Sequence, residues 1–276
     1  KMKTIAVLLT VFNRKDKTIQ CLHNIKAQQL PTDIQTDIYI VDGGSTDGTV
    51  ETVKKNFPEV HIKTTNGLFW NRGMIEAWKM AGNSYDYYLW LNDDTFIHKD
   101  CISTLLYVST QKRDKAIIMG STTDTQGNGI LTYGGRDETG KVAQSSDDSP
   151  VAVVMMNGNI VLVPQVVYRQ LGTLDPYFTH ARGDFDYGLR ARKAGIAMWQ
   201  AGHPLGECDL HERIDAWCDP EIPLGKRWKL MHRPNGMPPK EIFYLERRHY
   251  GLGIALFHYC TIHARCLFPS IWIKFK

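Results

Sequence analysis

The first half of the chain alternates short apolar blocks with stretches in which apolar residues recur at helical spacing. Continuous apolar runs predict buried strands at 4–12, 37–41, 60–63, 87–91 and 116–119. After the first run, Ile19, Leu22 and Ile25 recur at the spacing of a helix. Further helices are expected after Thr46 or Asp47, over 71–81 and over 101–110. Strands that alternate with helices in this way predict an α/β fold on a doubly wound, mostly parallel sheet.

Polar residues follow three of these predicted strands directly. They are Asn13 and Arg14, the turn from Asp42 to Ser45, and the cluster Asn92-Asp93-Asp94. Doubly wound sheets bind ligands outside the carboxyl ends of their strands. We therefore expect the three groups to line one crevice.

The pattern changes in the second half of the chain. Residues 120–150 are rich in Gly, Thr, Ser and Asp and read as a loop region with one short strand at 130–133. Asn157-Gly158 lies between apolar runs at 151–156 and 159–163 and is typical of a hairpin turn. A helix over 184–194, a strand over 196–200 and one long amphipathic helix over 241–264 complete the prediction.

Charge is distributed unevenly along the chain. The net charge is +4, yet residues 226–276 hold ten Lys and Arg against two acidic residues, which leaves −4 for the remainder. This distribution suggests an anionic partner for the tail alone, and it does not indicate a nucleic-acid-binding protein. Six scattered cysteines without a CxxC motif are read as free thiols in a reducing compartment. No apolar stretch approaches the roughly 20 residues that span a bilayer.

The acidic pair Asp93-Asp94 follows the predicted buried strand at 87–91. Two adjacent carboxylates at the mouth of a buried strand repel each other unless a cation or strong donors compensate. Mg²⁺ or Mn²⁺ takes one or two carboxylates and completes its shell with phosphate oxygens and water. The structural alternative is that one of the two aspartates caps the following helix.

A second acidic position, Asp42, begins a glycine-rich turn. Its carboxylate can accept hydrogen bonds from a base or a ribose, and Gly43 lets a ligand approach the backbone closely. The alternative is an ordinary turn in which Asp47 caps a helix.

A third acidic motif, Arg182-Gly183-Asp184-Phe185-Asp186, opens a predicted helix. A carboxylate at a helix N-terminus is kept ionised by the helix dipole and can act as a general base. Asp186 lies four residues before Arg190 and can form a simple helical ion pair. Asp184 has no such local partner, so it is the better catalytic candidate.

Taken together, these motifs resemble the family 2 glycosyltransferases, which have the GT-A fold and use a nucleotide-sugar donor. The resemblance runs in consistent order over residues 4–212. Its matching stretches are VFNR (11–14), VDGGSTDGT (41–49), NGLFWNRGMIEAW (66–78), LNDDT (91–95), NGNIVLVP (157–164), LGTLDPYF (171–178) and GDFDYGLRARKAG (183–195). Within the family, the chain is most similar to rhamnosyl- and galactofuranosyl-type transferases of bacterial surface polysaccharide synthesis.

The resemblance implies a role for each matching residue. Asp42 would contact the nucleotide base, with Val11, Asn13 and Arg14 nearby. Asp94 would bind the divalent metal and Asp93 the ribose or donor sugar, while Asp184 would be the catalytic base. Two residues depart from the family pattern. Gly183 stands where a Glu is usual, which puts acceptor recognition in doubt, and Asn92 replaces the first Asp of the commoner metal motif.

Four further positions are weaker candidates. His211 matches a histidine that binds the metal in several relatives, with a surface histidine as the alternative. Arg72 could meet donor phosphate, or lie at a solvated helix start. Asp186 and Trp217 are candidates for acceptor contact. The alternative for Asp186 is a helical ion pair with Arg190, and core packing is the favoured interpretation of Trp217. The set His203, Cys208, His211 and Cys218 matches no common zinc spacing.

The resemblance also divides the chain. Residues 1–225 form the expected GT-A domain, with a donor half at 1–120 and an acceptor half at 121–225, and residues 226–276 form a basic, aromatic helical tail. Such a tail suits an anionic membrane surface, where a lipid-linked acceptor would reside. The alternatives are a tail packed on the domain or a dimer contact, and the oligomeric state is left open.

The predicted function is an inverting, metal-dependent transfer from a nucleotide sugar to a glycan or lipid-linked glycan acceptor. We expect it in the cytoplasm or at the inner face of the cell membrane. One alternative is a sugar-1-phosphate nucleotidyltransferase, but its glycine-rich phosphate loop is missing from VFNRKDK after the first strand. The other is a catalytically inactive nucleotide- or glycan-binding protein, which Gly183 alone favours.

Overall fold

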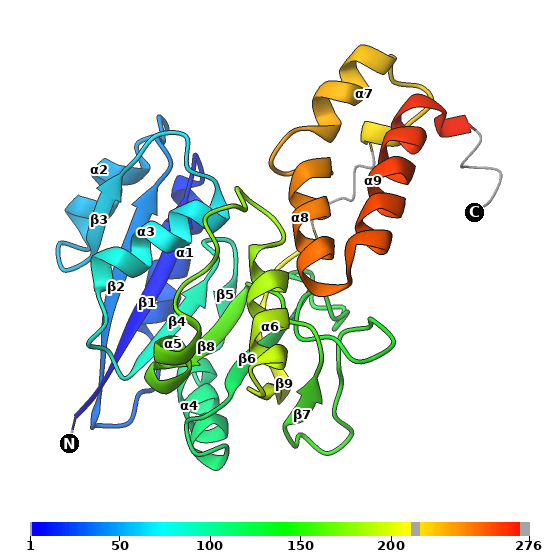
Figure 1. The fold of residues 1–276 in the computed structure, drawn as a ribbon. Helices are drawn as coiled ribbons and strands as arrows, with labels where there is room; N and C mark the ends of the chain where they lie inside the picture. Colours follow the sequence, from blue (N-terminus) through cyan, green and yellow to red (C-terminus); the bar gives the residue numbers. More distant parts are fainter. Residues whose placement is uncertain (1, 211–215, 271–276) are drawn as a thin grey trace.

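The computed structural model describes residues 2–210 and 216–270. Within them, one mixed sheet runs through the molecule with helices on both faces, and a group of C-terminal helices projects to one side (Figure 1). The strand order is β3-β2-β1-β4-β8-β6-β9-β5, with β7 paired to β9. The α/β class expected from the sequence is confirmed.

The first half has the predicted alternation of strands and helices. Its elements are β1 (Lys3–Val11), α1 (Lys15–Lys26), β2 (Ile34–Asp42), α2 (Thr49–Asn56), β3 (His61–Thr64), α3 (Trp70–Ala81) and β4 (Tyr87–Leu91). Strand β1 pairs in parallel with β2 on one side and with β4 on the other. The carboxyl ends of these three strands therefore meet at one edge of the sheet.

The second half completes the sheet and then adds the helical group. Its elements are β5 (Phe96–Ile97), α4 (Cys101–Gln111), β6 (Ile117–Thr123), β7 (Val151–Val153), β8 (Ile160–Pro164), α5 (Gln165–Leu171), α6 (Gly183–Lys193) and β9 (Met198–Glu207). The helical group consists of the short 3-10 helix η1 (Ala216–Cys218), α7 (Leu224–Met231), α8 (Pro239–His249) and α9 (Leu252–Leu267).

Strand β4 is apolar because both of its faces are buried. Alternate residues of a strand point to opposite faces, and in β4 both sets are buried. Leu89 packs in the core beneath α1 and α4, and Trp90 in the core beneath α3 and α6. Burial of such a side chain contributes about 1.5–3 kcal/mol to folding. A strand fixed this firmly on both faces holds the acidic cluster at its end in one position.

Three predicted local features are wrong. Asn157-Gly158 does not turn a hairpin, because β7 pairs with β9 while β8 lies antiparallel between β4 and β6. Residues 130–133 form only an isolated bridge between Thr123 and Leu131. The long helix over 241–264 is two helices, since Gly251 adopts a φ of 97° and the chain reverses into α9.

The C-terminal helices form a small core of their own. Trp217 packs there with Met231, Ile242, Ile262 and Cys266. The helical group thus includes Trp217 and begins upstream of residue 226, the start of the tail expected from the sequence. No helix in 2–210 or 216–270 is long and apolar enough to cross a membrane.

Candidate functional site

Three loops meet at the carboxyl edge of β1, β2 and β4, as the strand order requires. The loop after β1 is tied to the loop after β2 by Asn13, whose backbone N–H donates to Ser45 Oγ at 2.8 Å. The Asn13 side-chain oxygen accepts from the Thr46 N–H at 2.8 Å. Arg14 extends from the same loop to the acidic cluster after β4. The structure therefore brings the three predicted polar groups together.

Arg14 binds both carboxylates of the acidic cluster. Nη1 of Arg14 lies 3.1 Å from Asp93 Oδ1 and 2.7 Å from Asp94 Oδ2. Both aspartates are buried, whereas the Arg14 side chain is 41% exposed. Thr18 Oγ1 donates to the second oxygen of Asp93 at 3.3 Å. Two buried carboxylates thus share one guanidinium.

Burial sets the protonation behaviour of this cluster. It raises the pKa of Asp93 to about 6, against the lowering effect of Arg14 and with a further rise from the neighbouring charge of Asp94. Cys208 lies 4.0 Å from Asp94, and burial raises the pKa of its thiol to about 12. Cys208 is therefore a neutral neighbour of the cluster at physiological pH.

The donor set of the cluster fits a hard divalent cation in part. Paired carboxylates at a strand end are the protein ligands that Mg²⁺ and Mn²⁺ take, with phosphate and water at the other positions. No third His, Cys, Asp or Glu joins them to form a metal-binding group among the described residues. The predicted ligand His211 lies outside the described residues. A cation here would share Asp93 and Asp94 with Arg14.

Asp42, at the end of β2, is fully buried and shapes its own turn. Its carboxylate accepts backbone N–H groups from Gly44 at 3.0 Å and from Ser45 at 3.1 Å. Val11 is paired with Asp42 in the sheet, and its carbonyl accepts the Gly43 N–H at 2.9 Å. A Cβ on Gly43 would lie 3.1 Å from the Leu68 carbonyl oxygen. These contacts favour an ordered backbone turn, and the base contact expected of Asp42 stays a prediction.

Asp184 occupies the first turn of α6 and is buried. Its two carboxylate oxygens accept backbone N–H groups from Gly158 at 3.1 Å and Phe185 at 2.9 Å. Burial raises the pKa of Asp184, while these N–H groups lower it. The result is a carboxylate positioned by backbone donors and made more basic than in water, as a general base requires.

Trp70 connects the acidic cluster to Asp184, a role that the sequence did not reveal. Its indole N–H donates to Asn92 Oδ1 at 2.7 Å. Its ring packs so closely on Gly158 that a Cβ there would lie 2.6 Å from the ring. Asn92 therefore orients Trp70, and Trp70 lies against the residue whose N–H holds Asp184. From the sequence, Arg72 is the only candidate in this stretch, for a phosphate contact.

Gly183, the departure from the family pattern, has a packing explanation. An added Cβ at this position would clash with the side-chain oxygen of Asn71 in α3. That Asn71 amide donates to the carbonyls of Asp175 at 2.9 Å and Phe178 at 2.7 Å. A glycine at 183 therefore accommodates Asn71, whose amide links α3 to the loop before α6.

The remaining candidates make structural contacts. Arg72 is exposed and donates to the Pro176 carbonyl at 3.2 Å. Asp186 is fully buried and pairs with Arg190 at 2.8 Å, Arg248 at 3.1 Å and His249 at 2.8 Å. Trp217 is a core residue of the helical group. These contacts favour structural roles over the phosphate contact expected of Arg72 and the acceptor contacts expected of Asp186 and Trp217.

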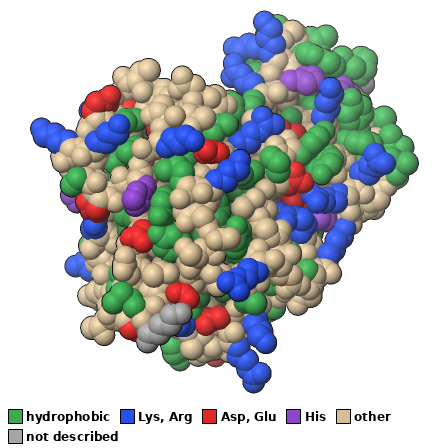
Figure 2. Space-filling model, turned by 60° about the vertical axis from the view of Figure 1, so that its left-hand side comes forward, with side chains coloured by type: hydrophobic (Ala, Val, Ile, Leu, Met, Phe, Trp, Pro, Cys, Tyr) green, Lys and Arg blue, Asp and Glu red, His purple; other side chains and the backbone are tan. Residues whose placement is uncertain are grey.

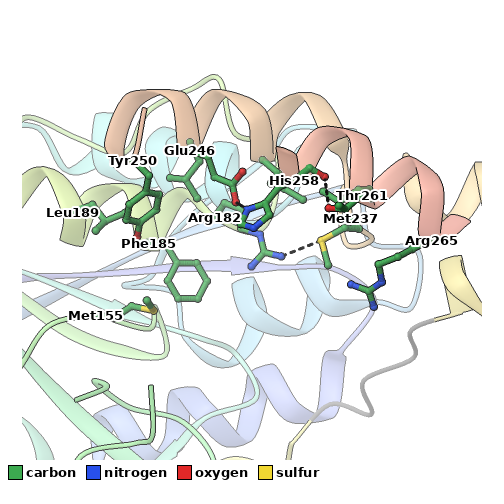
Figure 3. Close-up of a pocket in the computed structure, with 13 residues that line it drawn as sticks. Met155, Arg182, Phe185, Leu189, Met237, Glu246, Tyr250, His258, Thr261 and Arg265 are labelled. Carbon is green, nitrogen blue, oxygen red and sulfur yellow. Dashed lines mark hydrogen bonds and ion pairs between the residues drawn. The ribbon is translucent and has the colours of Figure 1, made fainter. Parts of the chain in front are cut away.

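A cavity of about 330 Å³ lies between α6 and the helices α8 and α9 (Figure 3). Arg182 and Phe185, on either side of Asp184, form part of its wall, and Leu189 lies one turn further along α6. Tyr250 and His258 close it from the C-terminal helices. It is largely apolar with a few polar groups, which is typical of ligand sites.

Comparison with solved structures identifies related folds. S. aureus TarS 1–349 in complex with UDP-GlcNAc has a TM-score of 0.59 at 13% identity, with 97% of this chain and 72% of that chain covered. The Pyrobaculum calidifontis mannosyltransferase in complex with GDP-Man and Mn²⁺ has a TM-score of 0.56 at 15% identity, with coverage of 96% and 75%. In a longer S. aureus TarS chain, with a TM-score of 0.58 at 13% identity, the match covers 89% of this chain but only 42% of that one. At these identities the likeness establishes the GT-A fold alone.

Comparison of sequences identifies the family. No curated protein sequence matches the chain significantly. The profile described as Glycosyl transferase family 2 matches residues 6–156, which is more than half of the chain and includes the strand-end loops and Trp70. The chain therefore belongs to glycosyl transferase family 2 and is an enzyme of the glycosyltransferase class.

Proposed function

We propose that this glycosyltransferase moves a sugar from a nucleoside-diphosphate sugar to an acceptor hydroxyl with inversion at the anomeric carbon. The observation that carries the proposal is the position of Asp184. It is a buried carboxylate held by two backbone N–H groups, and Trp70 links its surroundings to the strand-end acidic cluster. The two matched structures in complex with UDP-GlcNAc and GDP-Man support a nucleotide-sugar donor.

The proposed donor site is the crevice formed by the three loops. Asn13 and the Asp42 turn would hold the nucleoside, with Val11 and Gly43 lining the backbone beneath it. Asp94 would hold Mn²⁺ or Mg²⁺, together with His211, and Asp93 would contact the ribose or the donor sugar. The metal, when bound, neutralises charge on the departing diphosphate. Arg14 already provides a positive charge at the same carboxylates.

The proposed chemistry is a single displacement. Asp184 removes the proton from the acceptor hydroxyl, and that oxygen forms a bond to the anomeric carbon. The bond from the anomeric carbon to the diphosphate oxygen breaks on the opposite face, and the nucleoside diphosphate leaves with the electron pair. The N–H groups of Gly158 and Phe185 hold the Asp184 carboxylate in place for this transfer.

We further propose that the acceptor enters through the cavity between α6 and α8–α9. This cavity begins at the residues on either side of Asp184, and its mixed lining suits a glycan or a lipid-linked glycan precursor. The protein would then act in the cytoplasm or at the inner face of the cell membrane. A rhamnosyl- or galactofuranosyl-type reaction in surface polysaccharide synthesis is the narrower form of this proposal.

Two observations argue against the alternative functions that the sequence left open. Membership of a glycosyltransferase family argues against a sugar-1-phosphate nucleotidyltransferase. The inactive binding protein depended on Gly183, and the contact with Asn71 explains that glycine.

Replacement of the base tests the mechanism. We expect Asp184→Asn to lower kcat by about 10²–10⁴-fold, because a neutral amide cannot take the hydroxyl proton. Nucleotide binding should be unchanged, as measured by the melting temperature with UDP or GDP and Mn²⁺. Asp147→Asn, at an exposed position, is the matched control. Near-normal turnover of Asp184→Asn would assign the base to another residue.

The acidic cluster predicts a pH-dependent stability effect. Since the pKa of Asp93 is about 6 in the folded protein and near 4 when unfolded, its ionised form opposes folding above pH 6. At pH 8 in EDTA, Asp93→Asn should therefore be about 1–3 kcal/mol more stable than the wild type. The difference should shrink as the pH falls from 6 to 4 and be lost below about pH 3, where Asp93 is protonated in both states.

Urea unfolding at pH 8, 6 and 4 measures this difference. Asp16→Asn removes an exposed carboxylate from the first turn of α1 and serves as the control. If Asp93→Asn is less stable than the wild type at pH 8, the attraction of Arg14 outweighs the cost of burial, and our account of the cluster is wrong.

Filling the cavity tests the acceptor route. Leu189→Trp should lower kcat/KM for the acceptor at least about tenfold, because the indole would occupy space that the acceptor needs. Metal-dependent donor hydrolysis should persist. Val166→Trp, on the exposed side of α5, is the control. Unchanged acceptor kinetics in Leu189→Trp would exclude this cavity as the acceptor route.

A further inference from the structure

Helix α9 has two different faces. Its inner face contributes His258, Thr261 and Ile262 to the cavity. Its outer face exposes large apolar side chains, each between 40 and 64% exposed. With the adjoining residue Phe268, these are Leu252, Leu256, Phe257, Leu267 and Phe268. The large exposed side chains lie toward the two ends of the helix, and the exposed positions between them, Cys260 and Ala264, are small and uncharged.

Charge is excluded from the outer face of α9. Arg265 is the one Lys, Arg, Asp or Glu within the helix, and its guanidinium lies 4.8 Å from the ring centroid of Trp217, inside the helical group. A surface helix of a soluble protein normally carries charged residues on its solvent side. An outer face with several exposed apolar side chains and no charged residue indicates a binding surface for an apolar partner.

The helices beside α9 carry exposed basic side chains. Five Lys and Arg side chains are exposed on α7, α8 and the segment between them, namely Lys226, Lys229, Arg233, Lys240 and Arg247. Arg248 is also exposed but pairs with Asp175 and Asp186. Over residues 224–270, no Asp or Glu is exposed; Glu241 accepts from Thr179 and Glu246 pairs with His258. Figure 2 shows hydrophobic side chains gathered on this lobe, with Lys and Arg around them.

We propose that this surface, the outer face of α9 with the exposed basic residues of α7 and α8, docks on an anionic membrane. An apolar stripe flanked by Lys and Arg binds the interface of a bilayer that contains anionic lipid. A second copy of the chain is the less favourable occupant, because two such surfaces would bring like charges together.

The position of α9 relates membrane docking to the proposed function. One face of this helix would lie on the membrane while the other lines the cavity between α9 and α6. A helix is about 10 Å across. A lipid-linked acceptor at the membrane would therefore need to extend only about that far to reach the cavity. This statement about the acceptor rests on the proposed function, whereas membrane docking itself does not.

Liposome co-sedimentation of the full chain tests the docking surface. We expect the protein to sediment with vesicles of 30% phosphatidylglycerol in phosphatidylcholine, and not with pure phosphatidylcholine. Binding should weaken in high salt, because Lys and Arg contribute to it. The double variant Leu256→Ser, Phe257→Ser should lower the vesicle partition coefficient at least about tenfold. Both side chains are exposed, so the fold should be retained, which circular dichroism checks.

Tyr107→Ser is the matched control, because Tyr107 is 65% exposed on α4 of the catalytic domain. The proposal is overturned if the wild type does not bind anionic vesicles, or if the double variant binds them as well as the control. It is also overturned if light scattering shows a dimer that the double variant loses while vesicles remain unbound. A melting-temperature shift with UDP or GDP and Mn²⁺ in the same samples reports donor binding separately, so failure of docking and failure of the proposed function can be told apart.

Discussion

The candidate site depends on one electrostatic constraint, the burial of two adjacent carboxylates at the end of β4. Asp93 and Asp94 share one guanidinium from Arg14, which comes from the loop after β1. Burial outweighs the lowering effect of Arg14 and raises the pKa of Asp93. Paired carboxylates at a strand end can bind a divalent cation, and this pair lies beside the Asp42 turn in the crevice proposed for the donor.

The second requirement is that the proposed base be fixed relative to this cluster. Packing achieves this through glycine at two positions. Gly158 admits the ring of Trp70, whose indole N–H is held by Asn92 next to the acidic pair, and its own N–H holds Asp184. Gly183 admits the Asn71 side chain, which links α3 to the loop before α6. The base and the cluster are thus connected by contacts of rigid, largely buried groups.

Much of this could be predicted because it follows from local pattern. The apolar runs place β1, β2 and β4, and the rule for parallel strands brings Arg14, Asp42 and Asp93 to one edge. The errors concern contacts between distant segments. The insertion of β8 between β4 and β6, the partners of Asp186 in α8 and the break at Gly251 leave no periodic signal. The role of Trp70 could not be predicted, because it depends on Asn92 and Gly158, which are far from it in sequence.

The most direct test of the account is nucleotide binding measured with and without metal. With UDP or GDP at about 100 times its Kd and Mn²⁺ present, binding should stabilise the protein by about 2.7 kcal/mol. In a chain of this size that corresponds to a rise in Tm of roughly 5–10 °C. The rise should vanish in EDTA and in Asp94→Asn. An equal shift in EDTA, or no shift with either nucleotide, would contradict the claim that the acidic cluster at the end of β4 holds a metal and a nucleoside diphosphate.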